Sequence, residues 1–250
     1  KEEITLMIDI GTNGELVLGN RERLVCCSTA AGPAFEGAKI ECGMRGAQGA
    51  IDHVFWDKEG FRFSVIGDGK PRGICGSGLI DAIACLGLID ETGHMLSCQE
   101  AAEVCGAEIA AHMIQKENMT AFLFDPQAPQ VYLTQKDVRE VQLAKGAISA
   151  GILLLEKHLG ITHEDIQTIY IAGAFGNYMN PENACNIGLL PAALKTRIQS
   201  IGNAAGEGAK IALLNKEELA ETVRLSQQVE FLELAAIPEF QDCFVDELEF

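Results

Sequence analysis

An apolar segment near the start of the chain carries one acid, Asp9, and runs into a turn of small residues. The turn consists of Gly11, Thr12, Asn13 and Gly14. Asn13-Gly14 is a typical hairpin signal, because both residue types tolerate positive φ. Small residues let backbone N–H groups approach an anion closely, and a neighbouring carboxylate is suited to hold Mg²⁺ through water or to orient a water. The segment therefore predicts a phosphate-facing loop with Asp9 as its catalytic and metal-binding acid. An ordinary hairpin with a solvated Asp9 is the alternative.

A second glycine-bearing loop follows an apolar strand predicted at residues 168–172. Its candidate ligand-binding residues are Gly173, Ala174, Phe175, Gly176 and Asn177. In an open α/β sheet, ligands bind at the carboxyl ends of strands, which is where these residues fall. Glycines at such a position let the backbone pack flat against a planar base or a ribose. A plain strand-to-helix turn is the alternative.

Two further segments place small residues beside polar ones. Gly32 and Glu36 flank Pro33, so Glu36 is either a catalytic acid near a nucleotide or part of a solvated helix face. Gly76 and Ser77 open a predicted helix, where they offer either backbone amides to a phosphate or a helix cap. The surrounding GICGSG run does not follow a predicted strand in a βαβ unit, so a dinucleotide fingerprint is not predicted.

The composition narrows the classes of partner. The formal net charge of −17 argues against nucleic acid and against an anionic membrane surface, since both favour basic proteins. A nucleotide stays compatible with this charge, because phosphate sites use backbone amides, helix N-termini and a bound cation. No apolar run approaches the ~20 residues that span a bilayer, no signal peptide is visible, and the chain starts at Lys1. We therefore expect a piece of a longer cytoplasmic polypeptide.

The nine cysteines include no C-x-x-C pair, and several of them lie in apolar segments, as Cys85 does. This usage is typical of buried free thiols in a reducing cytoplasm. The spacing does not predict a metal or iron–sulfur cluster within this chain.

The elements expected to hold these loops form a mixed sheet. Antiparallel strands are predicted at residues 4–10, 15–18 and 23–28, and a second hairpin at 51–67. A capping box at Thr134 begins a long helix that runs through Leu159 and that Gly160 ends. The later predicted elements are a helix after Pro181, a strand at 198–201, helices at 204–214 and 216–227, and a strand at 229–234. Hairpins first and β/α alternation later indicate an α/β fold with helices on both faces of the sheet.

Residues 92–130 show the least regular pattern. A helix is predicted at residues 99–113, whereas the following segment, with Pro126 and Pro129, indicates a variable and exposed excursion.

Several segments taken together resemble a known family. The two glycine loops are similar to the second phosphate loop and the adenosine motif of the sugar kinase, heat-shock chaperone and actin ATPase superfamily. Over essentially the whole chain, the sequence resembles the reductive activators of corrinoid proteins. The segments that carry this resemblance are IDIGTNGE, AAGPAFEGA, RGICGSGLIDA, TQKDVREVQLAKGAI, YIAGAFGNY, IGLLP and PEFQDCFVDEL.

The resemblance implies an actin-like ATPase lobe with a ribonuclease H-like fold, in which residues 1–250 form the second half of the ATPase domain. It implies ATP and Mg²⁺ as cofactors, with Asp9 and residues 11–14 at the phosphates and residues 173–176 at the adenosine. It also implies a [2Fe-2S] domain upstream of this chain. In the whole protein, ATP would drive reduction of a Co(II) corrinoid to Co(I) on the corrinoid protein of a methyltransferase system. Ala174 departs from the pattern, because the superfamily often has glycine there.

Two alternatives from other classes stay open. A small-molecule kinase of the same superfamily would need an acidic base over a substrate pocket, and the sequence offers no clear candidate. A nucleotide-free module that docks onto a partner or forms a homodimer would not bind Mg-ATP.

Overall fold

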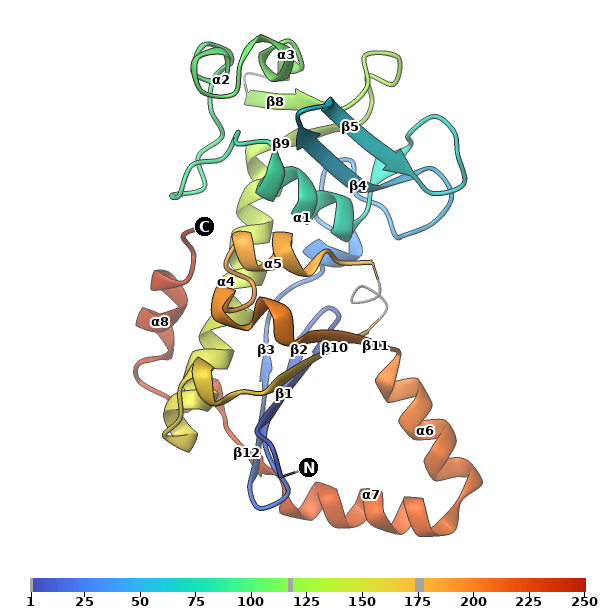
Figure 1. The fold of residues 1–250 in the computed structure, drawn as a ribbon, viewed down its shortest axis with the longest axis vertical. Coiled ribbons are helices and arrows are strands. Elements are labelled where there is room, and N and C mark those ends of the chain that lie inside the picture. The colour runs from blue at the N-terminus through green and yellow to red at the C-terminus, as the bar shows by residue number, and fades with distance from the viewer. Residues whose placement is uncertain (1, 117–118, 174–177) are drawn as a thin grey trace.

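The computed structural model describes residues 2–116, 119–173 and 178–250 of the chain. Two β-rich parts are connected by the long helix α4 (Gln135–Leu159), which passes alongside both of them (Figure 1). The lower part in Figure 1 holds a six-stranded sheet, and the upper part holds two three-stranded sheets. Among the described residues, no helix is both long and apolar enough to cross a lipid bilayer.

The six-stranded sheet is mixed and has the strand order β11-β10-β1-β2-β3-β12. Its strands are β1 (Thr5–Ile10), β2 (Gly14–Gly19), β3 (Leu24–Thr29), β10 (Thr168–Ala172), β11 (Ile198–Gly202) and β12 (Glu230–Phe231). The first three strands are antiparallel neighbours, whereas β10, β11 and β12 join the sheet in parallel pairs. The predicted N-terminal strands and the strand at 168–172 are confirmed. The predicted final strand at 229–234 is reduced to the two residues of β12.

The helix α4 covers the buried face of this sheet, and local sequence explains where it begins and ends. The Thr134 hydroxyl accepts a hydrogen bond from the Asp137 N–H at 3.3 Å, and the Asp137 carboxylate accepts one from the Thr134 N–H at 2.8 Å. Gly160 adopts a left-handed φ of 70° and ends the helix. The helix packs against β2 and β3, and its buried stripe comprises Val138, Val141, Ala144, Ile148, Ile152 and Leu155. The predicted helix, its cap and its stop are confirmed.

The upper part combines hairpins with short helices. Its strands are β4 (Ala50–Asp57), β5 (Gly60–Val65), β6 (Gly73–Ile74), β7 (Met113–Lys116), β8 (Met119–Leu123) and β9 (Tyr132–Thr134). Its helices are α1 (Gly76–Cys85), α2 (Cys98–Val104) and α3 (Ala107–Ala110). The predicted hairpin at 51–67 is confirmed, since β4 and β5 are antiparallel and Asp57 pairs with Gly60.

The prediction of an exposed excursion around residues 92–130 is wrong. The strands β7 and β8 lie there and form an antiparallel sheet with β9, and Phe122 and Phe124 are at most 1% exposed. The predicted single helix at 99–113 is divided into α2 and α3. These strands are too short for their alternation to be legible in the sequence, and their burial depends on distant contacts. One such contact is the edge-to-face packing of Phe122 on Phe61, with ring centroids 5.2 Å apart.

The remaining helices lie mostly around the lower sheet. They are α5 (Pro181–Asn186), α6 (Ala204–Leu214), α7 (Lys216–Gln228) and α8 (Phe240–Asp246), with short 3-10 segments η1 (Ala34–Glu36), η2 (His163–Asp165), η3 (Ala192–Arg197) and η4 (Leu234–Ala236). In Figure 1, α6 and α7 meet at a corner that stands away from the sheet, and none of the described residues in either helix is buried. The helix α7 borders the face opposite α4, because Met7 and Val17 line a hollow together with Leu225. Helices therefore lie on both faces of the sheet, as predicted.

Candidate functional site

The carboxyl ends of β1 and β10 lie side by side, because the two strands pair in parallel with Asp9 opposite Ala172. Gly173 follows directly, with a φ of 92°. A Cβ built on Gly173 would lie 2.8 Å from Asp9 Oδ1 and 2.7 Å from the Ile10 carbonyl oxygen. No side chain fits at that distance, so the close approach of the two chain segments requires glycine at position 173. The structure thus brings together Asp9 and Gly173, which lie far apart in the sequence.

Both residues line a hollow of about 620 Å³, which we call the central hollow. Its walls come from the turn after β1, the loop that precedes β4, the start of α1 and the segment after β10. The lining residues used below are Asp9, Gly11, Glu36, Arg45, Cys75, Gly76, Ser77, Gly173, Tyr178 and Asn203. A hollow of this volume falls in the range of about 300–1,000 Å³ that is usual for small-molecule and cofactor sites.

The predicted hairpin between β1 and β2 is confirmed, but its turn differs in backbone conformation. Ile10 pairs with Gly14, and the Gly11 N–H donates to the Asn13 carbonyl at 2.9 Å, so the turn spans residues 11–13. Neither Asn13 nor Gly14 is among the described residues with positive φ, so the turn forms without the backbone conformation that was expected of these two residues. Gly14 is a buried strand residue instead, and a Cβ there would lie 2.7 Å from Thr29 Oγ1. Packing beneath α4 therefore requires glycine at position 14. Among the described residues that line the central hollow, Gly14 is absent.

Glu36 lies against the same turn from the 3-10 segment η1. The Thr12 hydroxyl donates to Glu36 Oε2 at 3.0 Å, and Glu36 Oε1 lies 3.9 Å from a Cβ built on Gly11. Glu36 therefore adds a second carboxylate on the side of the central hollow that holds Asp9. Gly32 has a positive φ of 76° but does not reach the lining, and neither do the exposed Thr12 and Asn13, within the part of the chain that the structure describes.

The N-terminus of α1 opens on the opposite wall. Cys75 is the N-cap residue, and its side chain makes no capping hydrogen bond. Gly76 and Ser77, the first two helical residues, line the central hollow. Backbone N–H groups in a first helical turn lack partners inside the helix, and together with the helix dipole they favour an anion. The short strand β6 leads directly into α1, and the sequence did not predict this strand. Among the described strands, β6 and α1 are not part of a parallel βαβ unit.

Sequence reasoning missed Arg45, an exposed cation that lines the central hollow from the loop before β4. It also missed Tyr178 and Asn203 as lining residues. The only signal for Arg45 is a positive charge between glycines, which many loops share. The predicted positions Ala174, Phe175, Gly176 and Asn177 lie outside the described residues, so they stay predictions.

The positions of the cysteines and of the other side chains that could bind a metal directly bear on whether this chain holds a metal. All nine cysteines are free, and burial raises the pKa of the Cys27 thiol to about 12. Within residues 2–116, 119–173 and 178–250, no group of three or more histidine, cysteine, aspartate or glutamate side chains is arranged to hold a metal ion.

Comparisons with known proteins agree on one family. A family described as the C-terminal domain of RACo, the ASKHA domain, matches residues 3–250. A protein named corrinoid activation enzyme RamQ, from Eubacterium limosum, is 41% identical over 258 residues, which cover 98% of this chain and 42% of that protein. A [Co(II) methylated amine-specific corrinoid protein] reductase from Methanosarcina barkeri is 28% identical over 275 residues, covering 99% of this chain and 46% of that protein.

A solved structure of a reductive activator for corrinoid,iron-sulfur protein superposes with a TM-score of 0.89. It is 36% identical in sequence, and the match covers 100% of this chain and 40% of that chain. The chain thus spans less than half the length of these relatives.

Proposed function

This chain belongs to the family of C-terminal ASKHA domains described for RACo, and from that premise we propose that it is the ATP-binding part of a corrinoid-activating protein. The observation that carries the proposal is the central hollow, where Asp9, Gly173 and the start of α1 share one cavity. The names of the relatives, which are activators or reductases of corrinoid proteins, support the same role.

The residues of the central hollow fit the parts of a magnesium nucleotide. Asp9 supplies the oxygen ligand, directly or through water, that Mg²⁺ prefers, and Glu36 is the second acid beside it. Backbone N–H groups at Gly76 and Ser77, in the first turn of α1, are suited to phosphate oxygens. Mg²⁺, when bound, neutralises phosphate charge, and Arg45 adds a fixed cation to the same hollow. Gly173 and Tyr178 line the side assigned to adenosine.

In this proposal, ATP acts through a conformational equilibrium. Nucleotide-driven closure, or hydrolysis, changes how the corrinoid protein of a methyltransferase system is held, which a ligand can do only through different affinities for two states. A [2Fe-2S] domain upstream of this chain would supply the one electron that reduces Co(II) to Co(I). This chain supplies the second half of the actin-like ATPase domain, and the remainder of a longer cytoplasmic protein supplies the cluster and the first half.

The direct test is binding of Mg-ATP to this chain, followed by calorimetry and by thermal melting. We expect a measurable heat and a stabilisation that reaches about 2.7 kcal/mol at a nucleotide concentration of 100 times Kd. Asp9→Asn removes the metal-binding charge and should abolish both signals. Asp246→Asn, on the exposed end of α8, is the matched control and should leave them unchanged.

Absence of binding by the unmodified chain would contradict the proposal and favour a nucleotide-free docking module. In the longer protein, Asp9→Asn should also stop ATP-dependent corrinoid reduction, and unchanged reduction would remove the role given to Asp9. ATP consumption that responds to small hydroxylated acceptors but not to a corrinoid protein would favour a kinase.

A further inference from the structure

Asp81 lies in the second turn of α1, where its carboxylate is 1% exposed among buried apolar neighbours such as Leu79 and Ile80. A buried carboxylate is costly unless hydrogen bonds replace the water that it loses. Neither the proposed nucleotide contacts nor the packing of α1 requires an acid at this position. The hydrogen-bond partners of Asp81 therefore indicate what the residue does.

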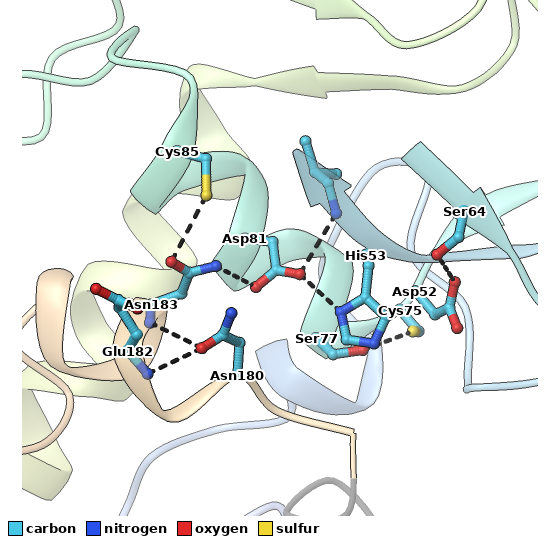
Figure 2. Close-up of polar contacts among 11 residues, drawn as sticks. Asp52, His53, Ser64, Cys75, Ser77, Asp81, Cys85, Asn180, Glu182 and Asn183 are labelled. Atoms are coloured by element: carbon cyan, nitrogen blue, oxygen red, sulfur yellow. Dashed lines mark hydrogen bonds and ion pairs between the residues drawn. The ribbon is translucent and has the colours of Figure 1, made fainter. Parts of the chain in front are cut away.

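Three donors from two elements, β4 and α5, point at this one carboxylate, as Figure 2 shows. From β4, His53 Nδ1 lies 2.9 Å from Asp81 Oδ2, and the Val54 N–H donates to the same oxygen at 3.4 Å. From α5, the Asn183 Nδ2 donates to Asp81 Oδ1 at 2.6 Å. The bond from Asn183 is the shortest of the three, and its acceptor is a carboxylate, so it belongs to the stronger class of hydrogen bonds.

The orientation of the Asn183 amide is itself fixed. The Cys85 thiol, at the end of α1, donates to Asn183 Oδ1 at 3.6 Å, which leaves the amide NH₂ facing Asp81. Asn183 is 6% exposed, and Asn180, the N-cap residue of α5, accepts from the Glu182 N–H at 2.9 Å. The start of α5 is thus held by its own cap and is fastened to α1 by a side-chain bond.

The two bonded helices each adjoin a residue that lines the central hollow. Asp81 is one helical turn after Ser77, which lines one wall, and α5 begins three residues after Tyr178, which lines the other. The helices α1 and α5 also pack against each other. The bond between Asp81 and Asn183 therefore joins the helix that begins at Ser77's wall to the helix that begins just after Tyr178.

We propose that Asp81 is a positioning residue for the nucleotide, because its bond to Asn183 sets the spacing between the start of α1 and Tyr178, the lining residue that precedes α5. The inference rests on the proposed function and adds a residue that touches no part of the ligand. Misplacement of a binding group by about 1 Å is enough to weaken a site strongly, so a tether between the two helices acts on affinity.

The test uses Asp81→Asn and the double variant Asp81→Asn with Asn183→Asp. In the single variant two amides face each other, and the short bond is lost or weakened. In the double variant the new amide at position 81 donates to the new carboxylate at position 183, while the amide carbonyl oxygen still accepts from His53 and Val54. Ser64→Ala is the control, because it removes a 2.6 Å bond to Asp52 between β4 and β5 and leaves the tether intact (Figure 2).

Calorimetry with Mg-ATP is performed well below the melting temperature of every variant, so that lost folding does not mimic lost binding. We expect Asp81→Asn to raise Kd about tenfold, which corresponds to the loss of roughly one charge-assisted hydrogen bond. The double variant should return Kd to within about threefold of the unmodified chain, and Ser64→Ala should not change it. Equal Kd values for Asp81→Asn and the unmodified chain would overturn the proposal, as would a double variant that binds no better than the single one.

Two further outcomes are distinguishable. If the unmodified chain does not bind Mg-ATP, the proposed function and this inference both fail. If it binds Mg-ATP and Asp81→Asn leaves Kd unchanged, only the inference fails. If a variant does not fold, hydrogen exchange of the unmodified chain decides instead. Mg-ATP should then slow exchange of amides in α1 and α5 together, and slowing in only one of the two helices would contradict the tether.

Discussion

At the level of single residues, two glycines serve the site in different ways. Gly173 occupies a left-handed conformation with its Cα next to Asp9, so it both turns the chain and leaves room for the carboxylate. Gly14 has an extended conformation, and it is required only because Thr29 and Ile148 leave no space for a Cβ. A glycine-rich pattern in the sequence does not distinguish these two reasons. The hairpin was therefore predicted correctly, whereas the positive φ expected at Asn13 and Gly14 was wrong.

Gly173→Ala tests the first reason. The added methyl group would contact Asp9 and the Ile10 carbonyl oxygen in a conformation that alanine rarely adopts, so we expect a loss of about 1–3 kcal/mol in the free energy of unfolding. Mg-ATP binding should be lost as well, because Asp9 must move. Urea unfolding and calorimetry measure the two effects.

Gly208→Ala is the matched control for that variant. Gly208 lies inside α6, and no atom lies within 4 Å of a Cβ built on it, so alanine should stabilise the chain by roughly 0.5–1 kcal/mol without changing binding. A Gly173→Ala chain that binds Mg-ATP as tightly as this control would refute the role of the close approach.

At the level of elements, the sheet β7–β8–β9 belongs to the core of the upper part. Phe122 is 0% exposed and contacts Phe61, His112 and Phe124 through their rings. Phe122→Ala should lower the free energy of unfolding by about 3–5 kcal/mol, because it leaves a cavity that rigid neighbours cannot fill. Phe55→Ala, which truncates a side chain 40% exposed on β4, should cost far less in the same urea titration. Equal and small costs would show that this sheet is not a structural core.

The middle of α4 holds a buried cation that binds the end of the chain. The Lys145 ammonium, whose side chain is 2% exposed, donates to the Glu249 carbonyl oxygen. Burial lowers the pKa of Lys145 from the ordinary value of 10.5, while the nearby Glu247 and Glu249 act in the opposite direction. Below the lowered pKa both the folded and the unfolded chain hold this proton. Between that pKa and 10.5 the unfolded chain holds more of it, so the free energy of unfolding rises with pH through this window.

Lys145→Met should therefore reduce the slope of stability against pH in the window between the lowered pKa of Lys145 and 10.5. Urea unfolding of both chains at several pH values measures the two slopes. Lys210→Met, which alters an exposed lysine paired with Glu207, should keep the slope of the unmodified chain. Parallel slopes for Lys145→Met and the unmodified chain would contradict the assignment.

The elements also show how far sequence reasoning reaches. The long helix α4 was predictable, because its capping box, its apolar stripe and Gly160 all act within a few residues of one another. The meeting of Asp9 and Gly173 was predictable too, since parallel neighbours in a sheet bring their carboxyl ends to one edge. The position of Arg45 and the sheet β7–β8–β9 were not predictable. Both depend on packing between segments distant in sequence, and short irregular stretches carry no periodic signal for such packing.

For the molecule as a whole, the net charge of −17 opposes compaction through mutual repulsion of carboxylates. Raising the ionic strength from about 0.01 M to 0.15 M shortens the Debye length from roughly 30 Å to 8 Å and screens that repulsion. We therefore expect the melting temperature to rise over this range of NaCl. KCl should give the same increase, because screening does not depend on the cation, and a decrease with either salt would show that attractive ion pairs dominate.

The strand β4 carries Trp56, opposite Phe61 on β5, and this is the single tryptophan of the sequence. Intrinsic fluorescence excited at the indole band therefore reports on the upper part of the molecule without any attached dye. Far-ultraviolet circular dichroism, by contrast, averages over every helix and strand. Because α4 runs through both parts, the two optical signals should change at one temperature, and separate midpoints would mean that the parts melt independently.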